Sequence, residues 1–384
     1  MLTWHFIHFL RFYVMCFGII LPEMNPLFTW CCKVLQFAYL CAKHFSMIRF
    51  FENHSLKNHN TFGIDVKAKY FFEFTEPHDL AVFLQNNQSW KEEKLIVIGE
   101  GSNILFLGDF DGLVIHPKVP GIFPVREDRQ NEWLEAGAGE IWDDFVEYCV
   151  VYGLGGVENL SLIPGKVGAA PVQNIGAYGQ EVCAVVERVK GFDLEKEETT
   201  EFSVDECRFA YRDSIFKSHL KNRFIITSVV FRLEKFPEFK LGYGDVEQKV
   251  RERGEVSLRN IREAIIEIRS SKLPDVMELG NAGSFFKNPV VDKALAEKLK
   301  AEYETLPVYP AGDGKTKLAA GWLIEKAGWK GVREVSVGVH EKQALVLVNY
   351  GNATGQEVWD LSEKIRQSVS EKFGVVLERE VNCV

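Results

Sequence analysis

Hydrophobic and polar positions repeat with two different periods along the chain, and these periods predict a mixture of helices and strands. Apolar residues at helical spacing, with capping or terminating residues at their ends, predict helices over 77–86, 140–152, 258–269, 293–303, 318–327 and 354–373. Alternating or continuous apolar runs predict strands over 69–74, 95–98, 112–117, 182–192, 224–233, 344–348 and 375–381. No segment repeats, so we expect an α+β chain with mixed sheets.

Local signals refine this pattern at three places. Ser203–Glu206 and Thr354–Glu357 have the spacing of capping boxes, and each is predicted to start a helix, the first a short one. Pro274 follows the helix over 258–269, which it is expected to end. Because the sequence after this proline starts a new set of elements, we place a domain boundary near residue 271.

The composition changes near residue 47. Residues 1–46 carry only four charged side chains but four of the eight cysteines, Cys16, Cys31, Cys32 and Cys41. Their longest apolar run, 12–21, is shorter than the roughly 20 residues of a membrane helix, and it lacks the basic start and small-residue cleavage site of a signal peptide. We expect translation to begin at Met47, which makes 1–46 a wrongly included extension. A signal peptide and a membrane anchor are the alternatives.

The net charge of −9 gives no support to nucleic-acid binding, since no block of Lys or Arg stands out. Past residue 46 the cysteines are Cys149, Cys183, Cys207 and Cys383, without the spacing of a zinc site. This pattern is typical of a cytoplasmic protein with no structural metal. Cys149 falls on the apolar face of the helix over 140–152, and we expect a buried side chain. An anionic ligand would need positive charge gathered locally.

A short glycine motif, Gly99-Glu100-Gly101-Ser102-Asn103, follows the predicted strand over 95–98. The third glycine of a Rossmann phosphate loop is replaced by Ile104, and a strand rather than a helix is predicted next, so a Rossmann fold is disfavoured. Two glycines allow consecutive backbone N–H groups to converge on a phosphate. A plain tight turn explains the motif as well.

A second segment, residues 163–179, is rich in small residues and reads IPGKVGAAPVQNIGAYG. Low side-chain bulk lets a flat cofactor lie against the backbone, and Gln173 and Asn174 offer amide hydrogen bonds. A compact surface loop is the alternative.

Three further motifs contain residues suited to chemistry. Arg212 lies between a tyrosine and an acid in YRDSIFK, and an arginine is suited to bidentate binding of a carboxylate, although a structural ion pair is equally simple. Ser284 is expected on an exposed, glycine-flanked turn, but no nucleophile elbow surrounds it. Glu378 and Glu380 share one face of the predicted strand over 375–381, which by default is a solvated face.

Taken together, GEGSN, IPGKVGAAPVQNIGAYG, YRDSIFK, GNAGSFFKNP, KLAAGWLIEKAG and LEREV resemble, in this order, the motifs of the UDP-N-acetylenolpyruvoylglucosamine reductase (MurB) family. The resemblance covers residues 58–381. It implies an FAD-binding domain of the vanillyl-alcohol-oxidase type, with two subdomains, over 47–271. A substrate-binding α+β domain over 272–373 and a strand over 374–384 that returns to the FAD domain follow from it too.

The activity implied by the resemblance is reduction of UDP-N-acetylglucosamine enolpyruvate to UDP-N-acetylmuramate in peptidoglycan precursor synthesis. FAD is the implied cofactor and NADPH the reductant, with NADPH and substrate using one site in turn. By resemblance, Arg212 stabilises the negative charge that develops on the substrate, Ser284 donates a proton to C2 and Glu380 supports the enolic intermediate.

The resemblance also assigns binding residues. Tyr243 matches a tyrosine of the subclass in which a loop closes over the substrate. The other positions implied for substrate contact are Lys272, Asn288, Lys330 and Gln343. The positions implied for flavin contact are Gly99, Glu100, Gly101, Ser102, Asn103, Pro164, Gly165, Gly168, Ala169, Gln173, Asn174, Gly176, Ala177 and Tyr178.

Two other functions compete with this interpretation. An oxidase on the same flavin scaffold would need neither Ser284 nor Glu380 near the flavin. A UDP-sugar-binding protein without activity would need none of the three catalytic residues. We expect a monomeric cytoplasmic enzyme with no nucleic-acid or membrane partner.

Overall fold

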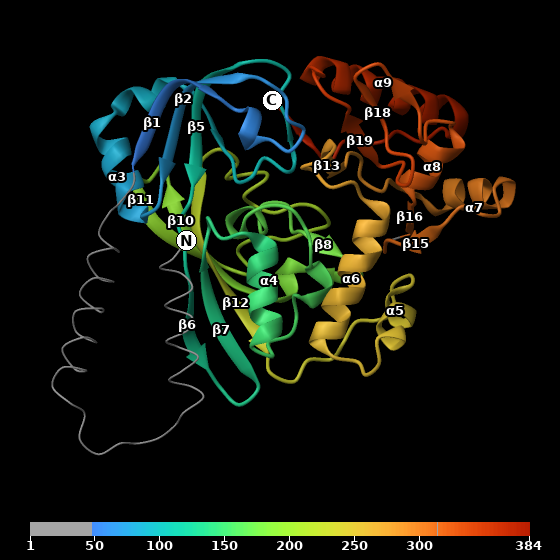
Figure 1. Ribbon diagram of the computed structural model, residues 1–384, viewed down its shortest axis with the longest axis horizontal. Helices are drawn as coiled ribbons and strands as arrows, with labels where there is room; N and C mark the ends of the chain where they lie inside the picture. Colours follow the sequence, from blue (N-terminus) through green and yellow to red (C-terminus); the bar gives the residue numbers. More distant parts are fainter. Residues whose placement is uncertain (1–47, 313) are drawn as a thin grey trace. The chain divides into compact units, whose positions relative to one another are not determined.

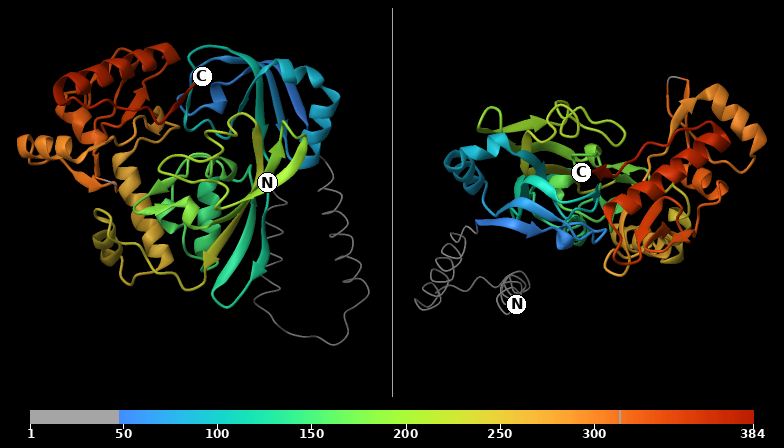
Figure 2. Two further views of the ribbon diagram at one scale, coloured as in Figure 1. Left: turned by 180° about the vertical axis from the view of Figure 1, so that it is seen from behind. Right: turned by 90° about the horizontal axis from the view of Figure 1, so that it is seen from above.

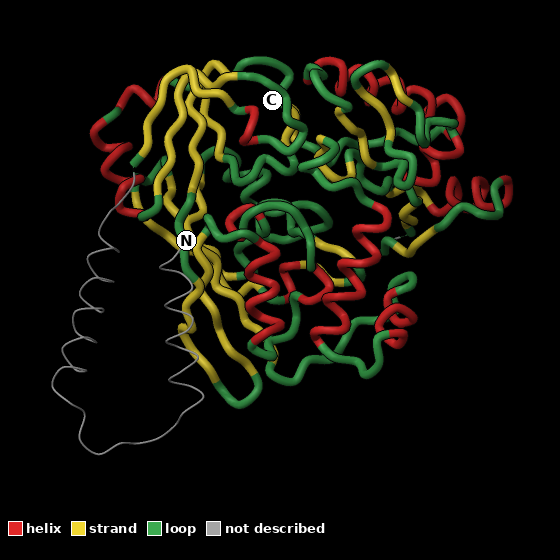
Figure 3. Tube along the Cα trace, viewed as in Figure 1, coloured by secondary structure: helices red, strands yellow, loops and turns green. Residues whose placement is uncertain are grey.

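The computed structural model describes residues 48–312 and 314–384. Met47–Val384 form one compact unit, and the extension predicted over 1–46 lies outside the described residues. The prediction of an α+β fold with mixed sheets is confirmed, because Figure 3 shows helices and strands interspersed along this whole unit. None of the helices in the described residues combines the length and the apolar composition needed to cross a membrane.

The first sheet contains four strands, of which three are parallel. Its order is β1 (Arg49–Ser55), β2 (Lys67–Phe74), β5 (Phe110–Pro117) and β3 (Lys94–Val97). Helix α3 (Pro77–Asn86) packs on this sheet, as predicted, with a proline in its first turn. The helix buries Leu80, Phe83 and Leu84, and the rings of Phe72 and Phe83 stack with centroids 3.8 Å apart.

The second sheet is antiparallel and has five strands (Figure 1). In order they are β11 (Glu198–Ser203), β10 (Val186–Asp193), β12 (Phe224–Glu234), β7 (Asn131–Gly137) and β6 (Ile122–Glu127). Helix α4 (Trp142–Val151) packs on this sheet, where the rings of Phe145 and Phe231 lie with centroids 4.5 Å apart. Helix α6 (Leu258–Lys272) packs on α4, and α5 (Val246–Glu252) packs on α6. Cys149 of α4 is fully buried, which confirms its interpretation as a small hydrophobic residue.

The C-terminal part combines two small sheets with three helices, drawn from orange to red in Figure 1. One sheet consists of β13 (Gly280–Ser284), β19 (Val346–Asn349), β18 (Val337–Val339) and β17 (Arg333–Glu334). The other consists of β14 (Val290–Asp292), β16 (Lys315–Leu318) and β15 (Val308–Pro310). The helices are α7 (Lys293–Glu302), α8 (Ala320–Lys326) and α9 (Gly355–Phe373).

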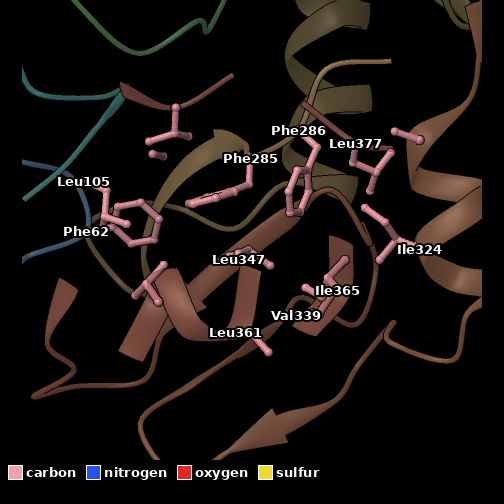
Figure 4. Close-up of a cluster of buried hydrophobic side chains, with 14 of the residues drawn as sticks. Phe62, Leu105, Phe285, Phe286, Ile324, Val339, Leu347, Leu361, Ile365 and Leu377 are labelled. Carbon is pink, nitrogen blue, oxygen red and sulfur yellow. The ribbon is translucent and has the colours of Figure 1, made fainter. Parts of the chain in front are cut away.

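The largest hydrophobic cluster joins the two ends of the chain. Phe285, Phe286 and Leu347 pack with α9, and the same cluster contains Phe62 and Leu105 from the N-terminal half (Figure 4). Because hydrophobic burial stabilises only a correctly assembled set of segments, this cluster fixes the C-terminal part against the first sheet. The boundary near residue 271 stays a prediction.

The end of the chain returns to the N-terminal half. Strand β20 (Asn382–Cys383) pairs in parallel with β4 (Ile104–Leu105), directly after the GEGSN motif. The N–H of Val384 donates to the carbonyl of Leu105 at 2.9 Å, and the C-terminus lies beside the first sheet in both figures (Figures 1 and 2). A segment after α9 is therefore held next to a loop about 280 positions earlier in the sequence.

Three predicted elements differ in the structure. The prediction of a strand over 375–381 is wrong, because this segment makes only one isolated bridge, between Phe286 and Arg379. Its alternating pattern reflects burial on one side of an extended chain, not a full ladder. The segment 182–192 begins with a 3₁₀ turn, Val182–Ala184, before β10. Glu206 accepts from the backbone N–H and the hydroxyl of Ser203, but a hydrogen-bonded turn follows instead of a helix.

The second capping box is confirmed and gives a test of local stability. The hydroxyl of Thr354 accepts from the N–H of Glu357, whose carboxylate accepts from the N–H of Thr354. Thr354→Ala should lower the free energy of unfolding by about 1 kcal/mol, since a helix N–H loses its partner. Thr354→Ser keeps the hydroxyl and is the matched control in urea denaturation. Equal midpoints for Thr354→Ala and the native chain would contradict this account of the helix start.

Candidate active site

A cavity of about 990 Å³ lies between the two sheets and the C-terminal part. Its walls come from regions far apart in the sequence, which include both glycine-rich motifs, the segment around Arg212, the end of β13 and the last residues of the chain. Arg212, Ser284 and Glu380 all line it. The structure therefore brings together the three side chains that the sequence motifs suggested for catalysis.

The loop over 99–103 follows β3 and is packed tightly. Gly101 has a φ of +65°, and a Cβ there would lie 2.1 Å from the carbonyl oxygen of His59, so only glycine fits. Glu100 accepts from the N–H of Gly165 at 3.0 Å, and the hydroxyl of Ser102 donates to the carbonyl of Pro164 at 3.0 Å. These side chains connect the first glycine-rich loop to the second.

The loop over 163–179 is also tightly packed, in this case near the end of a strand of the second sheet. A Cβ on Gly168 would lie 2.6 Å from the Cβ of Ala138, which explains the small residue there. Gln173 contacts the amide of Asn103, so the two loops meet again. Asn174 is buried and is absent from the cavity wall; its amide donates to Glu181 and to the carbonyl of Ala210. All the other predicted flavin-contact residues line the cavity.

Arg212 is held by the second loop and by the end of the chain. Its Nη2 donates to the carbonyl of Gly176 at 2.7 Å, and its Nε lies 2.9 Å from Oε1 of Glu380. The Nε–H is not aligned with that oxygen, so the contact is an ion pair and not a well-directed hydrogen bond. Arg212 also has a φ of +54°, a conformation that costs energy for a residue with a side chain.

Glu380 is the buried member of the two candidate glutamates. Its N–H donates to the carbonyl of Phe285 at 2.9 Å, which fixes the side chain beside the cavity. Burial raises the pKa of the Glu380 carboxyl, and the positive charges of Arg212, Lys217 and Lys287 act against this rise. Glu378 instead has a side chain that is 72% exposed and paired with Lys287. The structure therefore favours Glu380 as the residue of the site.

Ser284 ends strand β13 and is only half-buried. It pairs with Val346 after an irregularity in register, and the preceding Gly283 has a φ of +66°. The predicted exposed turn is therefore wrong, because the glycine forms a distortion within a strand. A strand end that faces the cavity holds the hydroxyl on a firmer support than a turn would.

The predicted substrate contacts divide into two groups. Tyr243, Lys272, Asn288 and Gln343 line the cavity. The ring of Tyr243 lies perpendicular to the ring of Tyr178, with centroids 5.8 Å apart. Lys330 does not line the cavity, and its ammonium lies 3.0 Å from the carboxylate of Glu325.

Four basic residues of the cavity wall were not singled out from the sequence, namely Lys166, Lys217, Lys221 and Arg269. Lys217 belongs to the YRDSIFK motif, so proximity to Arg212 was a signal available in the sequence. Arg269 falls in the last turn of α6, where a basic residue usually needs no further explanation. All four are brought to the cavity by folding, and together with Arg212 and Lys272 they supply the local positive charge that the chain as a whole lacks.

The residues present fit a flat, anionic cofactor such as FAD. Two glycine-rich loops form much of the wall, and their low side-chain bulk leaves backbone accessible to a ligand. The Nε of Arg269 is buried, and within residues 48–312 and 314–384 it has no hydrogen-bond partner, which leaves a donor for a bound acceptor. In the same described ranges, no three His, Cys, Asp or Glu side chains are grouped closely enough to hold a metal ion.

Comparison with known families gives two matches. Residues 275–384 match the C-terminal domain of UDP-N-acetylenolpyruvoylglucosamine reductase, and residues 72–200 match an FAD-binding domain. Both families had been suggested by the sequence motifs.

Individual relatives agree with these matches. The chain is 46% identical over 335 residues to the UDP-N-acetylenolpyruvoylglucosamine reductase of Flavobacterium johnsoniae, which covers 86% of this chain and 98% of the relative. It is 48% identical over 333 residues to that of Pseudomonas putida, with 86% and 98% covered. The crystal structure of the MurB reductase from Thermus caldophilus superimposes with a TM-score of 0.60 at 23% identity, over 88% of this chain and 99% of that one. The chain therefore belongs to the UDP-N-acetylenolpyruvoylglucosamine reductase family.

Proposed function

We propose that Arg212, Ser284 and Glu380 carry out the reaction of this enzyme, which reduces UDP-N-acetylglucosamine enolpyruvate to UDP-N-acetylmuramate with NADPH as reductant. The product is a precursor of peptidoglycan. The observation that carries the assignment of residues is their convergence on one cavity from three distant segments. The overall reaction consumes one NADPH and one proton, and it converts the enolpyruvyl double bond into the single bond of a lactyl ether.

The two glycine-rich loops are proposed to hold FAD. When bound there, FAD would supply the chemistry of hydride transfer from NADPH to the enolpyruvyl group. Asn174 is absent from the cavity wall, so its role in FAD binding is indirect. Its hydrogen bonds to Glu181 and Ala210 hold the second glycine-rich loop in place. NADPH and the UDP-sugar use the same cavity in turn, consistent with the single set of basic residues around it.

Arg212 and Glu380 are proposed to stabilise the charge that appears during reduction. Addition of hydride at C3 of the enolpyruvyl group places negative charge on C2 and on the adjoining carboxylate. The guanidinium of Arg212 is suited to bind this carboxylate, and its position is fixed before the reaction by Gly176 and Glu380. In its neutral form, which burial favours, the Glu380 carboxyl can donate a hydrogen bond to the same group, whereas its ionised form, which pairs with Arg212, would repel it.

Ser284 is proposed to give the proton that C2 requires. A hydroxyl is a weak acid in water, so its surroundings must favour loss of the proton. The basic side chains of the cavity, Arg212 and Lys217 among them, supply this favourable electrostatic field.

The remaining contacts are proposed for the UDP-sugar. Tyr243, Lys272, Asn288 and Gln343 line the cavity and form its substrate-binding wall. Tyr243 is half exposed, and we place this enzyme in the subclass whose tyrosine loop closes over the substrate. Lys330 contributes only if its ammonium leaves Glu325, with which it is paired.

The organisation of the protein completes the proposal. An FAD-binding domain over 47–271, a substrate domain over 272–373 and a returning segment over 374–384 act as one monomer. We place the enzyme in the cytoplasm, where a nucleotide-linked precursor and NADPH are both available. With a net charge of −9, no nucleic-acid partner is expected.

Replacement of Ser284 by alanine separates the two half-reactions. Flavin reduction by NADPH should proceed at the native rate, because it needs no proton at C2. Flavin reoxidation by the UDP-sugar should slow by roughly 100-fold to 10,000-fold, the contribution usual for a general acid. Stopped-flow absorbance of the flavin measures both rates. Ser370→Ala on α9 is the control, and an unchanged reoxidation rate in Ser284→Ala would remove the serine from its proposed role.

The pH dependence of reoxidation tests Glu380. Burial raises the pKa of this carboxyl, so its neutral form persists to higher pH than in an exposed glutamate. If the neutral form is the active one, the reoxidation rate should fall as pH rises through that raised pKa. Glu380→Gln cannot titrate and should lose this transition, while Glu378→Gln should keep it. A transition of the same pH midpoint in Glu380→Gln would assign it to another group.

A further inference from the structure

Lys217 lies on the turn that follows Arg212, and its neighbours hold this turn in place. The hydroxyl of Ser214 donates to the carbonyl of Val172 at 2.6 Å, which ties the turn to the second glycine-rich loop. The buried ring of Phe216 stacks on that of Phe224 in β12, with centroids 5.4 Å apart. Because Ser214 and Phe216 are both anchored, the adjoining Lys217 has a defined place in the cavity wall.

The ammonium of Lys217 holds the backbone of Arg212. Its Nζ donates to the carbonyl oxygen of Arg212 at 3.2 Å. That residue is in the left-handed region, with a φ of +54°, a conformation that persists only when its surroundings enforce it. On the other side of the same turn, Ala210 and Asp213 exchange two backbone hydrogen bonds of 3.0 and 3.1 Å. Lys217 therefore closes the turn that presents the guanidinium.

Among the carboxylates that act on the ammonium of Lys217, Glu380 has the largest effect. Within residues 48–312 and 314–384, no carboxylate lies within 4.0 Å of its Nζ, whereas Lys287 is paired with Glu378 at 2.5 Å. The charged groups that act on Lys217 are Lys287, Glu380, Asp213 and Glu378. Burial and the charge of Lys287 lower the pKa of its ammonium, and the three carboxylates raise it.

We propose that Lys217 is a positioning residue of the reduction: it fixes the backbone from which Arg212 reaches the cavity, and it is a second cation beside Glu380. This inference rests on the function proposed above for Arg212 and Glu380. Lys217 need not touch substrate or cofactor for this role. A lysine is suited to both tasks because one ammonium can donate to a carbonyl and act on a nearby carboxylate.

Lys217→Met in the FAD-loaded full chain tests this role. At saturating NADPH the limiting rate of flavin reduction should stay native, whereas the limiting rate of reoxidation by the UDP-sugar should fall roughly 10-fold to 100-fold, as is usual for loss of a residue that orients a functional group. Since the charge of the lysine lowers the pKa of Glu380, the transition that Glu380→Gln abolishes should move to higher pH in Lys217→Met. Lys217→Arg keeps the charge and should return the transition to its native midpoint.

A control separates this role from general damage. Lys190→Met removes another half-buried lysine, which pairs with Glu135 at 2.8 Å and does not line the cavity, so rates and transition should both stay native. If Lys217→Met does not retain FAD, Lys217→Gln removes the charge with a smaller loss of packing and should show the same shift. A native midpoint and a native limiting rate in these uncharged variants would overturn the proposal.

The native chain and Glu380→Gln distinguish a failure of this inference from a failure of the proposed function. If the native enzyme is not reoxidised by the UDP-sugar, the proposed function fails and the role of Lys217 fails with it. If native reoxidation occurs and Glu380→Gln abolishes the transition, a native profile in the Lys217 variants overturns the positioning role alone.

Discussion

The contact between Arg212 and Glu380 is the interaction on which the site depends. The two side chains come from segments 168 positions apart, and both are largely buried, with exposed fractions of 19% and 13%. Removing an ion pair from water usually costs about as much as its attraction returns, so such a pair is weak evidence for stability. The energy of the hydrophobic core and of the β4–β20 pairing maintains it. What the pair provides is an arginine and a carboxyl at fixed positions before a ligand arrives.

The glycine-rich loops extend this fixed arrangement to the rest of the cavity. The side chains of Glu100 and Ser102 form hydrogen bonds to the second loop, and the side chain of Asn174 forms one to Glu181. Polar side chains that the sequence offered as ligand contacts are therefore partly used to hold backbone in place. A backbone ordered before binding loses less conformational entropy when the ligand arrives, which favours tight binding of a large cofactor. Gly101 and Gly168 are required here because their neighbours leave no space for a Cβ.

The sequence predicted the elements whose signals are local. Helix α3 matches its predicted range because a proline and an apolar face define it, and α9 begins at the predicted capping box. The strand predicted over 375–381 and the helix predicted after Ser203 are both wrong for one shared reason. Each prediction used a local pattern, and a local pattern does not show whether the hydrogen-bond partners that complete a strand or a helix are present. The turn predicted around Ser284 failed because a glycine with positive φ occurs in a distorted strand as well as in a turn.

The site was predictable only in part, and the reason is again physical. Motifs named Arg212, Ser284 and Glu380, but no spacing in the sequence indicates that three such distant residues share a cavity; family resemblance supplied that link. Lys217 was missed because a lysine carries no sign of burial in its sequence, and its importance arises from the carbonyl and carboxyl that folding places near it. Charge at this site is therefore a property of the fold. A chain with a net charge of −9 lines its cavity with six basic side chains from three separate segments, namely Lys166, Arg212, Lys217, Lys221, Arg269 and Lys272. The two proposed ligands, NADPH and the UDP-sugar, are both polyanions, so the same cations are suited to attract each of them, and charge alone does not select between the two.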